Sequence, residues 1–216
     1  LGKEEYKEMH KAISRDCITL VKYKDRDVLP ITPERYKRIM IVHVKGAESG
    51  MGMLMKAMGM GGGKNPAEML KERLCEKGFD AFIYESPLDA MKKQIAAGEK
   101  PNINLYFAGK NAIDDFVSGM DLVITLCDVS SGRPSFGLSK GGGEIPWYVF
   151  ELPVVVIGCG QPTMLADVPQ ARTYINTYDA KPATFDALVD DLMAGPDAFK
   201  GRDPIDSFCG LFDARL

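Results

Sequence analysis

The sequence predicts an α/β fold: a three-layer α/β/α sandwich built on a mostly parallel sheet of five or six strands. Five short apolar runs rich in valine and isoleucine do not alternate with polar residues, as is typical of strands buried on both faces. Helical patterns lie between these runs, and this alternation is typical of a parallel sheet with helices on both faces. The 216 residues suffice for one sizeable core, so we expect residues 1–216 to form a single domain.

The expected strands have their own order in space. Numbered along the chain, they should take the flavodoxin-like order 2-1-3-4-5, in which the first and third strands are neighbours. The five runs are RIMIVHV (38–44), FDAFIYE (79–85), DLVITLCDV (121–129), PVVVIGC (153–159) and ARTYINTY (171–178).

The helix nearest the start is expected over residues 3–16. Because the chain opens on Leu1 and enters a helix almost at once, we expect it to be a piece of a longer protein. Asn65 can cap a second helix, with Pro66 at its first position and Glu68 as capping-box partner. Gly78 is expected to end that helix.

Three further helices are expected. SPLD begins one at Ser86, and Gly98 ends it; another covers residues 110–118. The last has Thr184 as its cap and ends at Gly195-Pro196. Its apolar stripe comprises Phe185, Leu188, Val189, Leu192 and Met193.

Composition excludes several classes of function. The net charge of −3 and the scattered Lys and Arg residues give no basic footprint for nucleic acid. The sequence has no apolar run of about 18 residues, so no membrane partner is expected. The five cysteines form no CxxC pair and only His10 and His43 could join them, so we expect no metal, no cofactor and reduced, mostly buried thiols in a cytoplasmic protein.

Residues 50–63, GMGMLMKAMGMGGG, form the most unusual segment. Glycine-rich loops can hold phosphate, but the P-loop pattern fails because Met58 and Asn65 stand where glycine and Ser/Thr are required. The dinucleotide pattern G-x-G-x-x-G also fails in every register. We therefore expect no nucleotide here. Loop 45–65 is either a soft, methionine-rich docking surface, or residues 51–60 form a short helix packed on their own domain.

A second glycine-rich loop contains GLSKG (137–141), which fits the nucleophile elbow G-x-S-x-G. That elbow needs a strand before the serine and a histidine later in the chain, and no histidine follows His43. Ser139 is thus interpreted as a loop serine. Cys127 and Cys159 are interpreted as buried thiols, and His43 as a hydrogen-bonded core residue.

The predicted order makes residues 38–44 and 121–129 neighbours at a topological switch point, where ligands bind beyond the carboxyl ends of strands. Loops 45–65 and 128–143 both leave from that point. Arg133 could recognise a carboxylate or a sugar hydroxyl, or it could be a surface arginine tied to the loop backbone. The substrate-proximal or domain-docking candidates are Asp128, Ser130, Arg133, Ser135 and Glu144. They form no complete catalytic set.

Two long segments resemble a known family. AISRDCITLVKYKDRDVLPITPERYKRIMIV (12–42) resembles the opening of the second domain of glycoside hydrolase family 3, where a helix and an LVK segment lead through an LP turn to the first strand. PVVVIGCGQPTMLADVPQARTYINTYDAKPATFDALVDDLMAG (153–195) resembles that domain's final strands and helix. The first strand runs into HVKGAES rather than Gly-Pro, which is most similar to the β-N-acetylhexosaminidase branch.

The resemblance implies a division of labour. In this family the aspartate nucleophile lies on a preceding (β/α)8 barrel, and the hexosaminidase branch also has its His–Asp acid/base there. In the β-glucosidase branch a carboxylate of the second domain can serve as acid/base. No residue of this chain matches a family catalytic motif. The resemblance therefore implies an accessory C-terminal domain that packs on a barrel and rims its carbohydrate cleft.

A second hypothesis is a free-standing α/β module that binds a small molecule at the switch point. The complete open reading frame distinguishes the two hypotheses. An upstream barrel supports the glycosidase domain, whereas a start codon next to Leu1 supports the module.

Overall fold

The computed structural model describes residues 4–25, 27–45, 65–85, 87–100, 118–128 and 152–202. The two long loops lie outside these residues apart from their ends, as does the expected helix 110–118 apart from Ser118. None of the helices in the described ranges has both the length and the apolar character that a membrane span requires.

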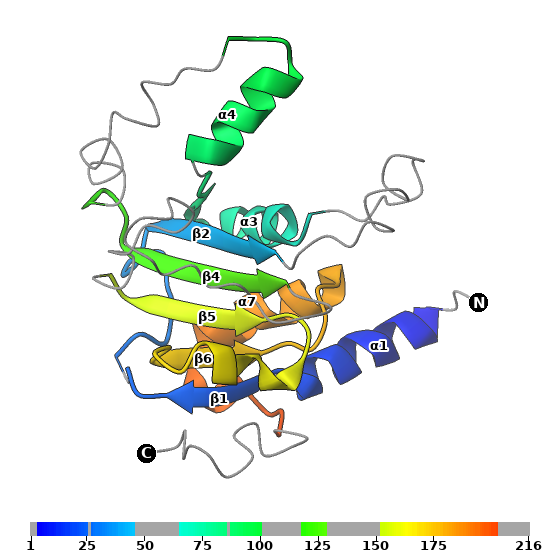
Figure 1. The fold of residues 1–216 in the computed structure, drawn as a ribbon. Coiled ribbons are helices and arrows are strands. Elements are labelled where there is room, and N and C mark those ends of the chain that lie inside the picture. Colours follow the sequence, from blue (N-terminus) through cyan, green and yellow to red (C-terminus); the bar gives the residue numbers. More distant parts are fainter. Residues whose placement is uncertain are drawn as a thin grey trace.

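The described strands form one six-stranded sheet in the order β1-β6-β5-β4-β2-β3 (Figure 1). Its last five members reproduce the predicted order 2-1-3-4-5, and all of them pair in parallel. The α/β fold class is thereby confirmed. The strands are β1 (Thr19–Tyr23), β2 (Arg38–Lys45), β3 (Asp80–Ile83), β4 (Leu122–Asp128), β5 (Val154–Gly158) and β6 (Thr173–Asn176).

Strand β1 is the sixth strand, and the apolar runs did not reveal it. It pairs antiparallel with β6 at the edge of the sheet, with a register shift between Leu20 and Lys22. Most of its side chains are half-buried, because an edge strand has a neighbour on one side only. Its sequence, TLVKY, therefore lacks the continuous apolar character of the inner strands.

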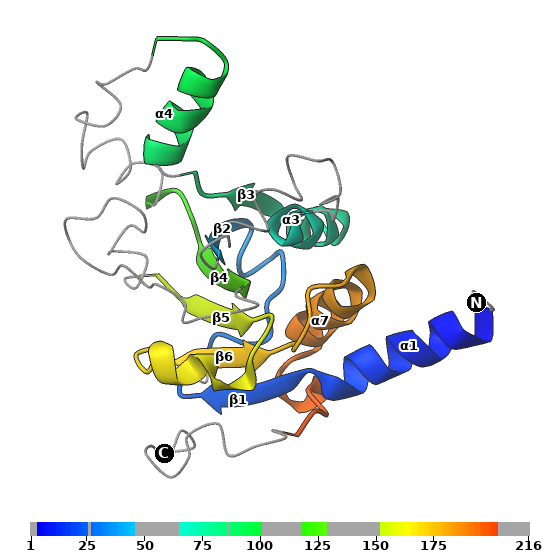
Figure 2. The same cartoon turned by 45° about the vertical axis from the view of Figure 1, so that its right-hand side comes forward.

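Two core clusters lie on opposite faces of the sheet. One contains Ile39 and Ile41 of β2 together with buried residues of the helices α3 (Pro66–Glu76) and α7 (Pro182–Ala194). The other contains Met40 and Val42, which point to the opposite face, with buried residues of the 3₁₀ helix η2 (Pro162–Asp167). Figure 2 shows α3 and α7 on the same side of the sheet.

The remaining described helices are α1 (Glu4–Cys17), α4 (Pro87–Ala96) and the 3₁₀ helix η3 (Pro196–Ala198). Helix α1 extends away from the sheet in both views (Figures 1 and 2). Its side chains Tyr6, Met9 and Ile13 are 57%, 52% and 55% exposed. These residues follow the spacing i, i+3, i+7, so they form an exposed apolar stripe on one face of α1.

Most of the predicted helix ends are confirmed. The Asn65 side chain accepts a hydrogen bond from the Ala67 N–H at the start of α3. Gly78, Gly98 and Gly195 have positive φ angles just beyond the ends of α3, α4 and α7, a conformation that glycine adopts without strain.

Thr184 does not cap the last helix, so that prediction was wrong. Pro182 occupies the first position of α7, which places Thr184 within the first turn. The N-cap residue is Lys181, and no side chain caps the helix. Asp179 Oδ1 instead accepts hydrogen bonds from the Lys181 N–H and from the Thr184 hydroxyl, which joins the first turn of α7 to the segment before it.

Helix α1 is tied to α7 by one part-buried ion pair. Arg15 Nη2 donates to Asp191 Oδ1 at 3.0 Å; the Asp191 side chain is fully buried, whereas that of Arg15 is half-exposed. Burial raises the pKa of Asp191, and the charge and hydrogen bond of Arg15 oppose that rise. The pair therefore holds a carboxylate in a place where its charge is costly.

We expect Arg15→Ala to lower the free energy of unfolding by about 1.5 kcal/mol at neutral pH, the low end for a hydrogen bond to a charged group. Because the folded pKa of Asp191 is raised, its contribution to stability is present below the usual carboxyl pKa and is lost as pH rises through the folded pKa. The loss in Arg15→Ala should therefore shrink at acid pH. Urea unfolding at several pH values measures it.

Lys11→Ala is the matched control, since Lys11 lies on the same helix and pairs only at the surface, with Glu8. We expect little change from it at any pH. A loss in Arg15→Ala that is the same at acid and neutral pH would contradict the role assigned to the ion pair.

The pKa of Asp179 is shifted downward, in the opposite direction from that of Asp191. Burial would raise the pKa of Asp179, but its hydrogen bonds from Thr184 and Lys181 and the Lys181 charge together lower it. Its stabilisation is therefore present above the usual carboxyl pKa and lost as pH falls. We expect Asp179→Ala to cost about 1 kcal/mol near neutral pH, as for a lost intramolecular hydrogen bond, with a smaller effect in acid. Thermal unfolding across pH checks both the size and the sign.

Candidate functional site

The topological switch point predicted from the sequence is present in the structure. From β2 the chain passes through α3 to β3 on one side, and β4 lies on the other side of β2. Parallel pairing runs from Ile39 opposite Leu122 to Lys45 opposite Asp128. The carboxyl ends of β2 and β4 therefore reach the same edge together, where α/β proteins bind ligands.

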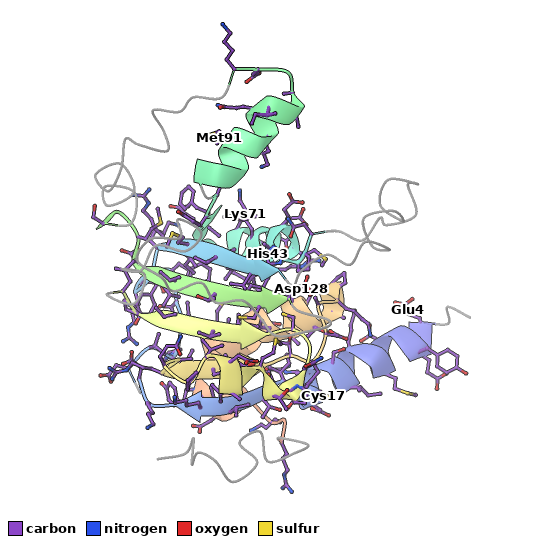
Figure 3. All side chains as sticks on the ribbon, viewed as in Figure 1. Glu4, Cys17, His43, Lys71, Met91 and Asp128 are labelled. Atoms are coloured by element: carbon purple, nitrogen blue, oxygen red, sulfur yellow. The ribbon has the colours of Figure 1, made fainter. Side chains whose placement is uncertain are left out.

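His43 and Asp128 meet at this carboxyl edge. His43 Nε2 lies 3.8 Å from Asp128 Oδ2, and the two side chains are 5% and 32% exposed. They project from the arrowhead ends of β2 and β4 (Figure 3). Among the described residues His43 Nε2 has no hydrogen-bond partner. His43 was expected to be a hydrogen-bonded core residue. Its side chain is buried, but its Nε2 atom lacks a hydrogen-bond partner within the described residues.

The two thiols next to this pair are buried and unreactive. Cys127 directly precedes Asp128 on β4, and Cys159 directly follows β5. The Cys159 N–H donates a hydrogen bond to the Cys127 carbonyl at 2.8 Å. Burial raises the pKa of Cys127, and raises that of Cys159 to about 12. Nucleophilic cysteine requires the thiolate, so neither residue suits covalent catalysis.

The β5–β6 half of the edge is filled by the domain's own hydrogen bonds. Thr177 Oγ1 lies 2.8 Å from the Asp179 carbonyl and 3.3 Å from the Gly158 carbonyl. The Asn176 amide donates to the Pro162 carbonyl. A Cβ on Gly158 would lie 2.2 Å from the Tyr174 hydroxyl, so this strand end is closely packed. Asn176 Oδ1, however, is buried without a hydrogen-bond partner among the described residues. The β2–β4 half differs in having a partly exposed carboxylate, that of Asp128.

Of the predicted site residues, Asp128 is described and lies at the expected edge. Ser130, Arg133, Ser135 and Glu144 lie outside the described residues, so the structure does not test their placement. His43 was missed as a site residue. The sequence did contain a signal for it. His43 lies near the end of an apolar strand, and the strand predicted to lie beside it contains Asp128 near its own end.

The chemistry available here is that of one imidazole and one carboxylate. No three His, Cys, Asp or Glu side chains gather as metal ligands within the described ranges. A carboxylate that is one-third exposed can bind a hydroxyl group or a proton, and a buried imidazole can hold it in place. His43 and Asp128 by themselves do not supply a nucleophile together with a separate acid on the other side of a substrate bond.

Comparison with known proteins gives a consistent picture. No protein-family model matches the chain. It is 30% identical over 215 residues to a protein of Cellulomonas fimi described as a beta-N-acetylglucosaminidase/beta-glucosidase, a match that covers 96% of this chain and 34% of that protein. The chain thus spans about a third of this relative's length.

Solved structures give similar coverage. A beta-glucoside phosphorylase, BglX, superposes with a TM-score of 0.70 and 26% identity, covering all of this chain and 34% of that one. A glycoside hydrolase family 3 beta-N-acetylglucosaminidase from Paenibacillus sp. str. FPU-7 superposes with a TM-score of 0.57 over 94% of this chain and 33% of its own; at 14% identity this shows the fold alone. Together these matches support the resemblance to family 3 and leave its branch open.

The burial of the thiols predicts a labelling pattern. In the native chain a maleimide should modify Cys17 and Cys75, which are exposed, and spare Cys127 and Cys159, which are buried. Denaturation should make all four reactive. Peptide mapping by mass spectrometry reads out each site; rapid native labelling of Cys127 or Cys159 would contradict their assignment as core thiols.

Proposed function

We propose that the chain is the accessory C-terminal domain of a longer retaining glycoside hydrolase of the β-N-acetylhexosaminidase type. It packs on a catalytic (β/α)8 barrel and rims the cleft that binds the sugar. One observation carries this proposal: nearly the whole chain matches about a third of a protein described as a beta-N-acetylglucosaminidase/beta-glucosidase.

The chemistry of the carboxyl edge supports a shared site. Retaining hydrolysis needs a nucleophile and an acid/base group about 5–5.5 Å apart across the glycosidic bond. At this edge the described residues offer Asp128 and His43, which lie 3.8 Å apart and so form one group rather than two separated reacting groups. The second reacting group would therefore come from another part of the longer protein.

The apolar stripe on α1 supports domain docking. Tyr6, Met9 and Ile13 are each more than half exposed, on a helix that stands away from the sheet. Adjacent apolar side chains of this size are typical of surfaces that a partner covers. We assign this stripe, and the methionine-rich loop 45–65, to the contact with the barrel.

Asp128 is the candidate that lies nearest the sugar. It is partly exposed at the switch point, and the loop that carries Ser130, Arg133, Ser135 and Glu144 begins directly after it. The four loop residues are proposed as further substrate or docking contacts. In this arrangement the domain supplies polar groups to the rim, and the barrel supplies the nucleophile.

A β-glucosidase-type enzyme is the second candidate. The position of Asp128 favours it, because in that branch a carboxylate of the second domain can serve as acid/base. The similar structure described as a beta-glucoside phosphorylase adds a further option, in which phosphate replaces water as the acceptor.

The test uses the protein encoded by the complete open reading frame, with chromogenic N-acetylglucosaminide and glucoside substrates, each with and without inorganic phosphate. We expect N-acetylglucosaminide cleavage by the complete protein and none by the 216-residue chain, which lacks the nucleophile. Faster glucoside cleavage would favour the second candidate. A reaction that depends on phosphate and yields a sugar phosphate would identify a phosphorylase.

Two outcomes would contradict the proposal. One is turnover by the 216-residue chain that exceeds a heat-killed control and disappears in Asp128→Asn. The other is an open reading frame that begins next to Leu1, which would favour the free-standing small-molecule module.

A further inference from the structure

The pair at the carboxyl edge contains an unexplained group. His43 is 5% exposed and its Nε2 has no hydrogen-bond partner among the described residues. A buried polar atom without a partner is destabilising, and in native proteins such an atom requires an explanation. The nearest charged group is the Asp128 carboxylate, 3.8 Å away, which is too long for a hydrogen bond.

We propose that His43 is a positioning residue for Asp128. In the working enzyme the His43 Nε2–H donates a hydrogen bond to Asp128 Oδ2 and fixes the carboxylate toward the substrate. This inference rests on the proposed function, since it takes Asp128 to contact the sugar. The proposal gives a role to His43, whose side chain is in neither core cluster and is not taken to react with the substrate.

The strand geometry supports this assignment. The backbone of β2 is paired with β4 along its whole length, with His43 opposite Leu126 and Lys45 opposite Asp128. Side chains two residues apart on a strand share a face, so Ile39, Ile41 and His43 point to the α3–α7 side. Asp128 shares that face with Ile124 and Leu126. The imidazole is therefore held by the sheet, while the more exposed carboxylate can rotate to meet it.

Within the described part of the chain, the Asp128 carboxylate is the partner that suits the imidazole. The Cys159 thiol, on the same face, is neutral because burial raises its pKa to about 12. Cys127 points to the opposite face, with the second core cluster. A bond to an ionised carboxylate is stronger than one between neutral groups, so the Nε2–H···Oδ2 bond can offset the burial of the ring.

The kinetic test compares two substitutions of His43 in the complete protein. His43→Leu keeps the bulk and removes the donor; His43→Gln keeps a side-chain N–H at similar reach. We expect His43→Leu to lower kcat/KM about tenfold, mainly through kcat, as for a lost charge-assisted hydrogen bond. His43→Gln should stay within about threefold of the natural protein.

Asp80→Asn is the matched control, because it removes one carboxylate charge at the amino end of β3, on the opposite edge of the sheet. It should leave the kinetics unchanged. Full activity of His43→Leu, or equal impairment of His43→Gln and His43→Leu in proteins that melt alike, would overturn the positioning role.

A spectroscopic test does not depend on catalysis. The 216-residue chain contains two histidines, His10 and His43, so His43→Gln assigns the ring signals in ¹⁵N NMR. We expect His43 to show a protonated, slowly exchanging Nε2–H that loses its protection in Asp128→Ala and keeps it in Asp80→Ala. An unprotonated Nε2 in the natural chain would overturn the inference whatever the enzyme's activity. If the bond is seen but Asp128→Ala retains full turnover, the role of Asp128 at the sugar fails instead.

Discussion

The parallel pairing of β2 with β4 is the interaction on which the other features depend. Seven residue pairs, from Ile39–Leu122 to Lys45–Asp128, join the two strands over the full length of β4. Because side chains alternate along both strands, this one register sends Ile39, Ile41 and Ile124 to the α3–α7 face and Met40, Val42 and Val123 to the other. A shift of β2 by one residue would exchange its side chains between the two cores and would move His43 to the face opposite Asp128.

The same pairing decides where chemistry can occur. Helices α3 and α7 cover one face and η2 lines the other, so the described sheet offers polar groups mainly at its ends. At the carboxyl end, β5 and β6 use Thr177 and Asn176 to satisfy nearby backbone carbonyls. Strands β2 and β4 instead end in a buried imidazole and a part-exposed carboxylate. The partly exposed carboxylate at the end of β4 thus distinguishes the β2–β4 half of this edge from the more closely packed β5–β6 half.

The strand order could be predicted from the sequence because inner parallel strands are apolar on both faces and lie between well-marked helix ends. Strand β1 could not, since an edge strand needs no continuous apolar run, and Thr184 was mistaken for the cap of a helix whose N-cap residue is Lys181. Asp128 was predicted as a site candidate because it follows a strand at the switch point, and it lies at that edge. His43 was not predicted as a site candidate. Its interest lies in the 3.8 Å between its Nε2 and Asp128 Oδ2, and a single sequence gives no distance between two strands.

The pairing also explains why this domain would need a partner to act. A sheet fixes the ends of its strands to within a fraction of an ångström, which suits the orientation of one carboxylate. The carboxyl ends of the five parallel strands all lie on one edge, so side chains at these ends reach a ligand from one side only. A retaining mechanism requires groups on both sides of the glycosidic bond. Under the proposed function, the parallel strands that bring Asp128 to this edge therefore leave the opposite side of the sugar to another domain.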